Sequence, residues 1–309
     1  AEFFSTAYIS TEKPPKNKTK SNVGVMISTM SFPKGIVIEN SNKAAEVSAL
    51  FKEWKEVTEK IFLWDYAINF DNYFEFYPTV SIVQKNLQFY LKNGVTGIFM
   101  HGSDEGSFAA FGDLKNYLYA QLFNNPYVDL ASHVQLFLEN KYPTIGKALN
   151  DYYLLIEKKA LESNKTIDIY GGIKQSVNKY LSDDKLNKIL IYLLAQNKFK
   201  PEEQKAANLV QMAFVFQKLE FMRTKGVGEG GYGLLDEKSG AFNLNPQVRE
   251  LTAKLAQLSK VLQINSYNEA GFLLDHYLAE WKGKIVAKPY QNLFYKKPIK
   301  VLSNLDEDY

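Results

Sequence analysis

The sequence predicts an α/β protein in which a parallel sheet with packed helices is followed by an all-helical region. In the first 125 residues, short apolar and β-branched runs alternate with segments of helical periodicity. From about residue 126 onward, one segment of helical periodicity follows another, without strand-like runs between them. The composition of the 309 residues, 46% hydrophobic and 23% charged, suits a globular protein of two domains or one large one.

Four strand-like segments are expected in the first 125 residues: FFSTAYIS (3–10), NVGVMIST (22–29), IFLWDYAINF (61–70) and VTGIFMHG (95–102). Helices are expected between and after them, at 42–60, 81–94 and 113–123. This alternation is typical of a parallel sheet covered by helices. By their number, four strands indicate either a small open sheet or the second half of a (β/α)₈ barrel, which has eight strands.

A helical bundle is expected over residues 126–285, because apolar residues recur at spacings of three and four in 144–159, 201–223, 245–263 and 268–284. The glycine-rich segment GVGEGGYG (226–233) is interpreted as a flexible loop between two helices. It has no preceding strand and no Lys-Ser/Thr pair, so a phosphate-binding loop is not supported. Residues 296–309 return to β-like composition, and residues 286–309 are interpreted as a linker.

Composition excludes several classes of function. The net charge of +3, without a clustered basic surface, does not indicate a nucleic-acid partner. No apolar run is long enough to span a membrane. Cysteine is absent and the three histidines are far apart in the sequence, so no metal site and no cofactor are expected.

Polar and aromatic side chains gather where the third and fourth strands end. Trp64, Asp65, Tyr66 and Asn69 close the third strand, and His101, Asp104 and Glu105 follow the fourth. Each group alone is equally compatible with a packed Trp beside a capping Asp, or with a polar turn. However, the carboxyl ends of parallel strands meet at one edge, where ligands bind in such folds. Carboxylates beside aromatic rings are the groups that glycoside hydrolysis uses.

Four segments carry a resemblance to a known family: STAYISTEKPPKNKTKSNVGVMIST, FLWDYAINFDNYFEFYPT, GVTGIFMHGS and FGDLKNYLYAQLFNNPYVDL. In this order they resemble a bacterial family of domains of unknown function. Part of that family is placed in glycoside hydrolase family 163, endo-β-N-acetylglucosaminidases that act on complex N-glycans. The resemblance covers about residues 1–160 well and the helical remainder more loosely.

The resemblance implies a TIM-type (β/α)₈ barrel. Residues 1–125 would then be its last four βα units, residues 126–285 a helical domain, and residues 286–309 a linker and the start of a truncated β-sandwich. The N-terminal half of the barrel, belonging to the same protein or to another chain, would be a structural partner. The resemblance also implies an exported protein, periplasmic or at the outer surface, either free or lipid-anchored.

For the site, the resemblance implies a substrate-assisted, retaining mechanism on an N-acetylglucosamine-containing glycan. Asp104 would orient the 2-acetamido group of the substrate, and Glu105 would act as general acid and then base. The remaining residues would bind substrate: Trp64, Asp65, Tyr66, Asn69 and His101. Two alternatives stay open, a glycosidase of other specificity, such as an α-glucuronidase-like enzyme, and a non-catalytic glycan-binding or scaffold protein.

Overall fold

The computed structural model describes residues 1–102, 109–181, 184–227, 233–238, 241–286 and 290–291. The first part of the chain contains β1 (Phe3–Ala7), η1 (Ile9–Thr11), β2 (Val23–Ser28), η2 (Ile38–Asn40), α1 (Ala44–Val57), β3 (Ile61–Tyr66), α2 (Val80–Lys92), β4 (Gly97–His101) and α3 (Gly112–Asn124). These elements confirm the strands and helices expected there, with bounds that differ by a few residues.

The helical part follows with α4 (Leu130–Lys141), α5 (Gly146–Ser163), α6 (Lys174–Ser176), the π-helix η3 (Val177–Leu181), α7 (Asp184–Ala195), α8 (Gln204–Lys225), α9 (Gln247–Leu262) and α10 (Leu274–Val286). The expected helices are confirmed in α5, α8, α9 and α10, although α10 begins six residues later than its periodicity predicted. No helix among the described residues is long and apolar enough to cross a membrane.

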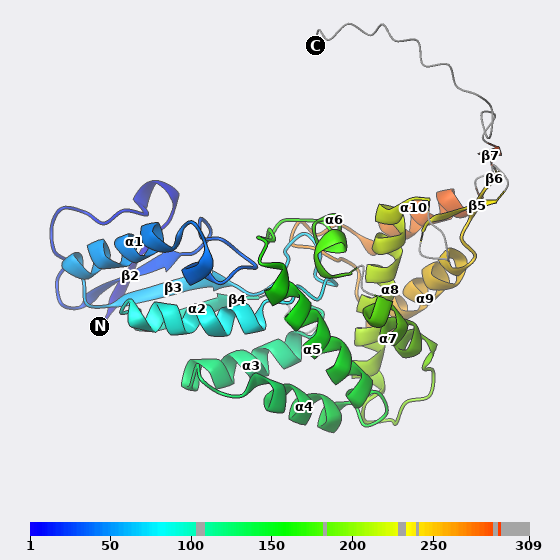
Figure 1. Cartoon of the computed structure of the whole chain (residues 1–309), viewed down its shortest axis with the longest axis horizontal. Helices are drawn as coiled ribbons and strands as arrows, with labels where there is room; N and C mark the ends of the chain where they lie inside the picture. The colour runs from blue at the N-terminus through cyan, green and yellow to red at the C-terminus, as the bar shows by residue number, and fades with distance from the viewer. Residues whose placement is uncertain (103–108, 182–183, 228–232, 239–240, 287–289, 292–309) are drawn as a thin grey trace, which may run out of the picture.

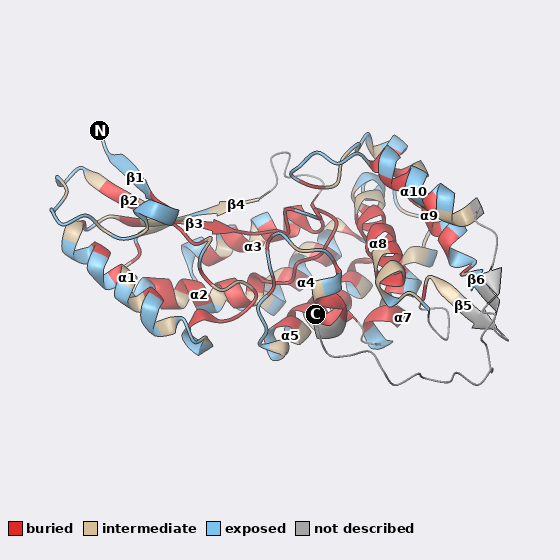
Figure 2. Ribbon diagram, turned by 90° about the horizontal axis from the view of Figure 1, so that it is seen from above, coloured by how far each residue is buried: buried red, intermediate tan, exposed pale blue. Residues whose placement is uncertain are grey.

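The four strands of the first part form one parallel sheet in the order β1-β2-β3-β4. Each strand therefore lies beside the next strand in the sequence. Both crossover helices, α1 and α2, lie on the same side of the sheet (Figures 1 and 2). This arrangement confirms the α/β class and leaves the other side of the sheet without crossover helices.

The two faces of the sheet differ in burial, as alternation along the strands requires. On the helix-covered face, Ile27, Ile61 and Leu63 are completely buried. On the opposite face, Phe4 and Phe99 are 36% and 46% exposed. Parallel sheets are ordinarily covered on both sides, so this open face is the unusual surface of the molecule.

Two glycines allow aromatic rings to lie against the open face. A Cβ atom at Gly24 would lie 2.6 Å from the ring of Phe4, and one at Gly97 would lie 2.6 Å from the ring of Phe62. The rings of Phe4 and Phe62 pack against each other, with centroids 4.4 Å apart. These aromatic side chains fill the amino-terminal part of the open face.

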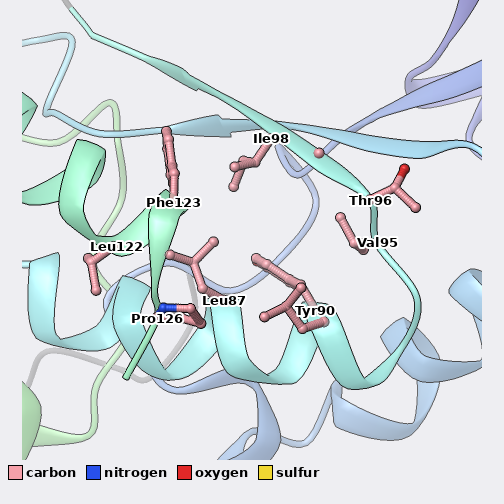
Figure 3. Close-up of a pocket in the computed structure, with 10 residues that line it drawn as sticks. Leu87, Tyr90, Val95, Thr96, Ile98, Leu122, Phe123 and Pro126 are labelled. Atoms are coloured by element: carbon pink, nitrogen blue, oxygen red, sulfur yellow. The ribbon is translucent and has the colours of Figure 1, made fainter. Parts of the chain in front are cut away.

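A groove lies at the free edge of β4, on the helix-covered side (Figure 3). It has a volume of about 190 Å³ and lies between β4, α2 and α3. Its lining is mainly apolar and includes Tyr90, Leu91, Ile98, Leu122 and Phe123.

The glycine-rich segment differs from its interpretation as a loop between two helices. It connects α8 to a small antiparallel sheet of β5 (Leu235–Lys238), β6 (Ala241–Leu244) and β7 (Tyr290–Gln291). The backbone amide of Leu235 donates to the Gly226 carbonyl at 3.0 Å, so strand pairing begins beside the end of α8. Of the predicted linker and β-sandwich start at 286–309, residues 287–289 and 292–309 lie outside the described residues.

The loop after β3 joins the sheet to the helical part. We call residues 67–79 the rim loop, because they lie at the carboxyl end of the sheet. The Phe70 amide donates to the Ile169 carbonyl at 2.7 Å, and the Tyr73 amide donates to the Tyr267 carbonyl at 2.8 Å. One cluster of buried apolar side chains extends from Ala7 in β1 to Trp281 in α10. The sheet and the helices therefore share a core.

Candidate functional site

Side chains from three neighbouring strands meet on the open face at its carboxyl end. The register pairs Ser28 with Trp64, Trp64 with Phe99, and Tyr66 with His101, so all five lie on one face. The ring of Trp64 lies 5.5 Å from Phe99 and 5.7 Å from His101, and Tyr66 lies 5.9 Å from His101. We call Ser28, Trp64, Tyr66, Phe99 and His101 the rim cluster.

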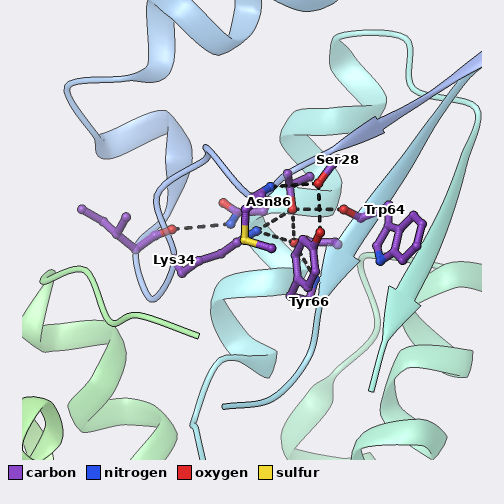
Figure 4. A network of polar contacts seen from close by, with 9 residues as sticks. Ser28, Lys34, Trp64, Tyr66 and Asn86 are labelled. Carbon is purple, nitrogen blue, oxygen red and sulfur yellow. Dashed lines mark hydrogen bonds and ion pairs between the residues drawn. The ribbon is translucent and has the colours of Figure 1, made fainter. Parts of the chain in front are cut away.

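The hydroxyl of Tyr66 belongs to a short polar network beneath this surface. It shares a hydrogen bond of 2.9 Å with the Ser28 hydroxyl. Burial raises the pKa of the Tyr66 phenol above its usual value, so the phenol keeps its proton at neutral pH. Figure 4 shows Tyr66 between Ser28 and Lys34, with the indole of Trp64 directed away from the network.

Two polar atoms of the rim cluster have no hydrogen-bond partner among the residues that the structure describes. The indole Nε1 of Trp64 and the Nδ1 of His101 are both shielded from solvent and make no hydrogen bond. An unpaired buried donor or acceptor costs about 1–3 kcal/mol, so such atoms are expected to be satisfied by a bound group. Both atoms belong to residues whose rings already form the apolar part of the cluster.

Asp65, predicted to bind substrate, follows Trp64 in β3 and precedes Tyr66, and the Lys34 ammonium that pairs with it lies 5.1 Å from the centroid of the Tyr66 ring. Asp65 lies on the helix-covered face, 5% exposed. Its carboxylate forms an ion pair with Lys34 at 2.7 Å and accepts a hydrogen bond from the Thr29 hydroxyl at 2.6 Å. The same oxygen accepts from the backbone amide of Tyr66 at 2.9 Å. Asp65 therefore supports the neighbouring Tyr66 from behind the sheet.

Asn69 is also separate from the rim cluster. Its side chain is fully buried in the rim loop and donates to the Glu75 carboxylate and to the Gly171 carbonyl. Glu75 accepts further hydrogen bonds from the hydroxyls of Ser176 and Tyr180. Burial raises the pKa of Glu75, and these donors oppose the increase. This network attaches the rim loop to α6 and η3.

Lys115 holds the far end of the rim loop. Its ammonium group is buried and donates to the Tyr77 carbonyl at 3.1 Å. Burial lowers the pKa of Lys115 to about 8, although the carboxylates of Glu157 and Glu75 oppose this. Tyr77 has a φ of 39°, a strained conformation for a bulky residue that persists only where its surroundings impose it.

Two residues from loops of the helical part, which were not among the predicted site residues, lie at the carboxyl end of the sheet. Tyr170 and Glu269 come from loops before α6 and α10. The ring of Phe70 lies 5.6 Å from Tyr170 and 5.0 Å from His101, so Phe70 connects Tyr170 to the rim cluster. No sequence pattern links these positions, because they meet only in the tertiary structure.

The catalytic pair predicted from the sequence, Asp104 and Glu105, lies outside the described residues. Its assignment stays a prediction. The described part of the chain contains no group of three or more histidine and carboxylate side chains arranged to hold a metal ion. Of the predicted substrate-binding residues, the structure brings together Trp64, Tyr66 and His101.

The description of the matched family names no activity. Residues 3–153 match a family described as a domain of unknown function (DUF4838). The matched region contains all four strands of the parallel sheet and the three strand ends that carry the rim cluster. No curated protein matches this sequence.

Proposed function

We propose that this protein is a glycoside hydrolase whose substrates are N-acetylglucosamine-containing glycans, and that it is an endo-β-N-acetylglucosaminidase with a substrate-assisted, retaining mechanism. The rim cluster carries the proposal, because it combines aromatic surfaces with polar groups at the carboxyl ends of parallel strands. Sugar rings stack on aromatic faces through their C–H groups while their hydroxyl and amide groups form hydrogen bonds. The resemblance of the sequence to family 163 supports the choice of sugar.

Each member of the rim cluster has a role in this proposal. Trp64 supplies the apolar floor and its free Nε1 donates to a substrate oxygen. Tyr66, protonated and oriented by Ser28, donates to the acetamido oxygen. His101 binds a hydroxyl through its free Nδ1. Asp104 and Glu105 would orient the acetamido group and transfer the proton.

We also propose that the sheet is part of a TIM-type barrel, completed by further strands of the same protein or of another chain. The support is the strand order, the crossover helices on one side and the open aromatic face. In a barrel this face would be the interior, and the groove beside β4 would receive apolar side chains of the next βα unit. Export to the periplasm or outer surface is part of the same proposal, since complex N-glycans occur outside bacterial cells.

The experiment compares the protein with Asp104→Asn and Glu105→Gln on an N-glycan with a chitobiose core, using mass spectrometry of the products. We expect cleavage within the chitobiose core, and a loss of at least about 100-fold in kcat for Glu105→Gln, which is typical of removing a general acid. Trp64→Ala should weaken glycan binding instead. Glycan-array binding of every variant is measured in parallel.

The outcomes separate the alternatives. Unchanged turnover of Glu105→Gln would remove that residue from the mechanism. Glycan binding without product from the parent protein would favour the non-catalytic binding protein. Cleavage of a uronic-acid glycoside instead would favour the α-glucuronidase-like enzyme.

A further inference from the structure

We infer that Tyr170 and Glu269 form an outer sugar-binding subsite, which extends the rim cluster onto the helical part of the protein. The inference rests on the proposed function and identifies where a longer oligosaccharide would run. In Figure 1 the loops that precede α6 and α10 both lie at the end of the sheet toward which the strands point.

The first support is the ring of Tyr170, which is both exposed and fixed. Its side chain is 45% exposed, yet its hydroxyl donates to the Glu269 carboxylate at 2.7 Å and its backbone amide donates to Asp168 at 2.9 Å. An exposed aromatic ring held in one orientation loses little conformational entropy when a ligand stacks on it. Tyr170 therefore has the property that sugar stacking requires.

The second support is the rigidity of the two loops. Besides the bond from Phe70 to Ile169, the Glu269 amide donates to the Phe70 carbonyl at 2.8 Å. The loop of Tyr170 is closed by Gln175, whose side chain bonds both the amide and the carbonyl of Asp168, at 2.7 and 2.9 Å. The Tyr170–Glu269 pair is thus preorganised relative to the sheet.

The third support is continuity with the rim cluster. The Phe70 ring lies between His101 and Tyr170 and is itself 1% exposed. It packs against both rings, so Tyr170 is held at a fixed position relative to the rim cluster. An oligosaccharide bound in the rim cluster would reach Tyr170 with its next sugar units.

The chemistry of the pair specifies a neutral polyhydroxylated ligand. A carboxylate accepts hydrogen bonds at two oxygens, and the Tyr170 hydroxyl bonds only Oε2 of Glu269. The other oxygen is directed to no described partner and can accept from sugar hydroxyls. Burial, and then the carboxylates of Asp168 and Glu269, raise the pKa of the neighbouring Asp71. These carboxylates repel an anionic sugar.

The test measures binding of N,N′-diacetylchitobiose and of tetra-N-acetylchitotetraose, below called chitobiose and chitotetraose, to the full chain by calorimetric titration. We expect Tyr170→Ala to weaken chitotetraose binding about tenfold, the effect of one lost aromatic contact, and to change chitobiose binding less than twofold. Glu269→Gln, which preserves the contact with the Tyr170 hydroxyl, should weaken chitotetraose binding severalfold. Tyr170→Trp should restore it, because it restores the ring.

The matched control is Tyr127→Ala. Tyr127 is 65% exposed and lies between α3 and α4, on the helix-covered side. The Tyr127→Ala variant should bind both sugars with the affinity of the parent protein. Parent-like chitotetraose binding by Tyr170→Ala, or equal loss of both sugars, would overturn the outer subsite while the proposed function stands. A parent that binds neither sugar would overturn the proposed function, and the subsite with it.

Discussion

Single residues at the carboxyl end of the sheet divide into those that face a ligand surface and those that hold it in place. Adjacent residues in β3 differ in role because successive side chains of a strand point to opposite faces of the sheet. Trp64 and Tyr66 lie on the open face, while Asp65 between them lies on the covered face and pairs with Lys34. The Asp65 carboxylate is hydrogen-bonded, whereas the Trp64 Nε1 and His101 Nδ1 atoms make no hydrogen bond to the described residues.

The ion pair of Lys34 with Asp65 is expected to contribute to the stability of the fold. Burial lowers the pKa of Lys34 and the Asp65 carboxylate opposes that change. Lys34→Met should lower the free energy of unfolding by about 3 kcal/mol, because it leaves a buried carboxylate without its cation. Chemical denaturation followed by Trp fluorescence measures this loss.

The exposed pair of Lys43 and Glu46 is the matched control for that prediction. Both side chains are largely solvated, so Lys43→Met should change the free energy of unfolding by less than about 0.5 kcal/mol. Equal effects of the two substitutions would show that the pair behind Tyr66 contributes no more than a surface contact.

Among the strands, the packing of β2 against its neighbours depends on Gly24. A Cβ atom at Gly24 would lie 2.6 Å from the Phe4 ring and 2.8 Å from the backbone carbonyl of Lys60. The ring could move aside, but the neighbouring backbone could not. The close packing of β1 and β3 against β2 therefore requires glycine at this position.

We expect Gly24→Ala to lower the free energy of unfolding by about 2 kcal/mol, through steric overlap within the sheet. Gly102→Ala is the control, because an added Cβ there meets no atom of the other described residues within 4 Å. It should have no effect or stabilise slightly by restricting the unfolded chain. Thermal denaturation of both variants checks the difference, and equal melting temperatures would contradict it.

At the scale of the whole molecule, the parallel sheet and the helices form one packed body. The sequence predicted a sheet part at 1–125 and a helical domain at 126–285. The buried cluster crosses the boundary between these parts, and the Glu75 network ties the rim loop to α6 and η3. Unfolding of one part would expose apolar surface of the other.

We therefore expect one cooperative thermal transition for the described body, with equal calorimetric and van't Hoff enthalpies. Glu75→Ala should move the whole transition to lower temperature, because it leaves the buried donors of Asn69, Ser176 and Tyr180 without their acceptor. Glu162→Ala, which removes an exposed carboxylate paired with Lys158, should leave it in place. Two resolved transitions would instead support independent domains.

The sequence by itself determined the α/β class, the order of the strands and most helices, because periodicity reports directly which side of an element is buried. It also placed Trp64, Tyr66 and His101 at strand ends, where parallel strands bring their residues together. Asp65 and Asn69 were grouped with them from proximity in the sequence. Only the tertiary structure decided that Asp65 pairs with Lys34 and that Asn69 is buried against Glu75. It alone brought Tyr170 and Glu269 to the same edge, since contacts between residues a hundred positions apart leave no local pattern in a sequence.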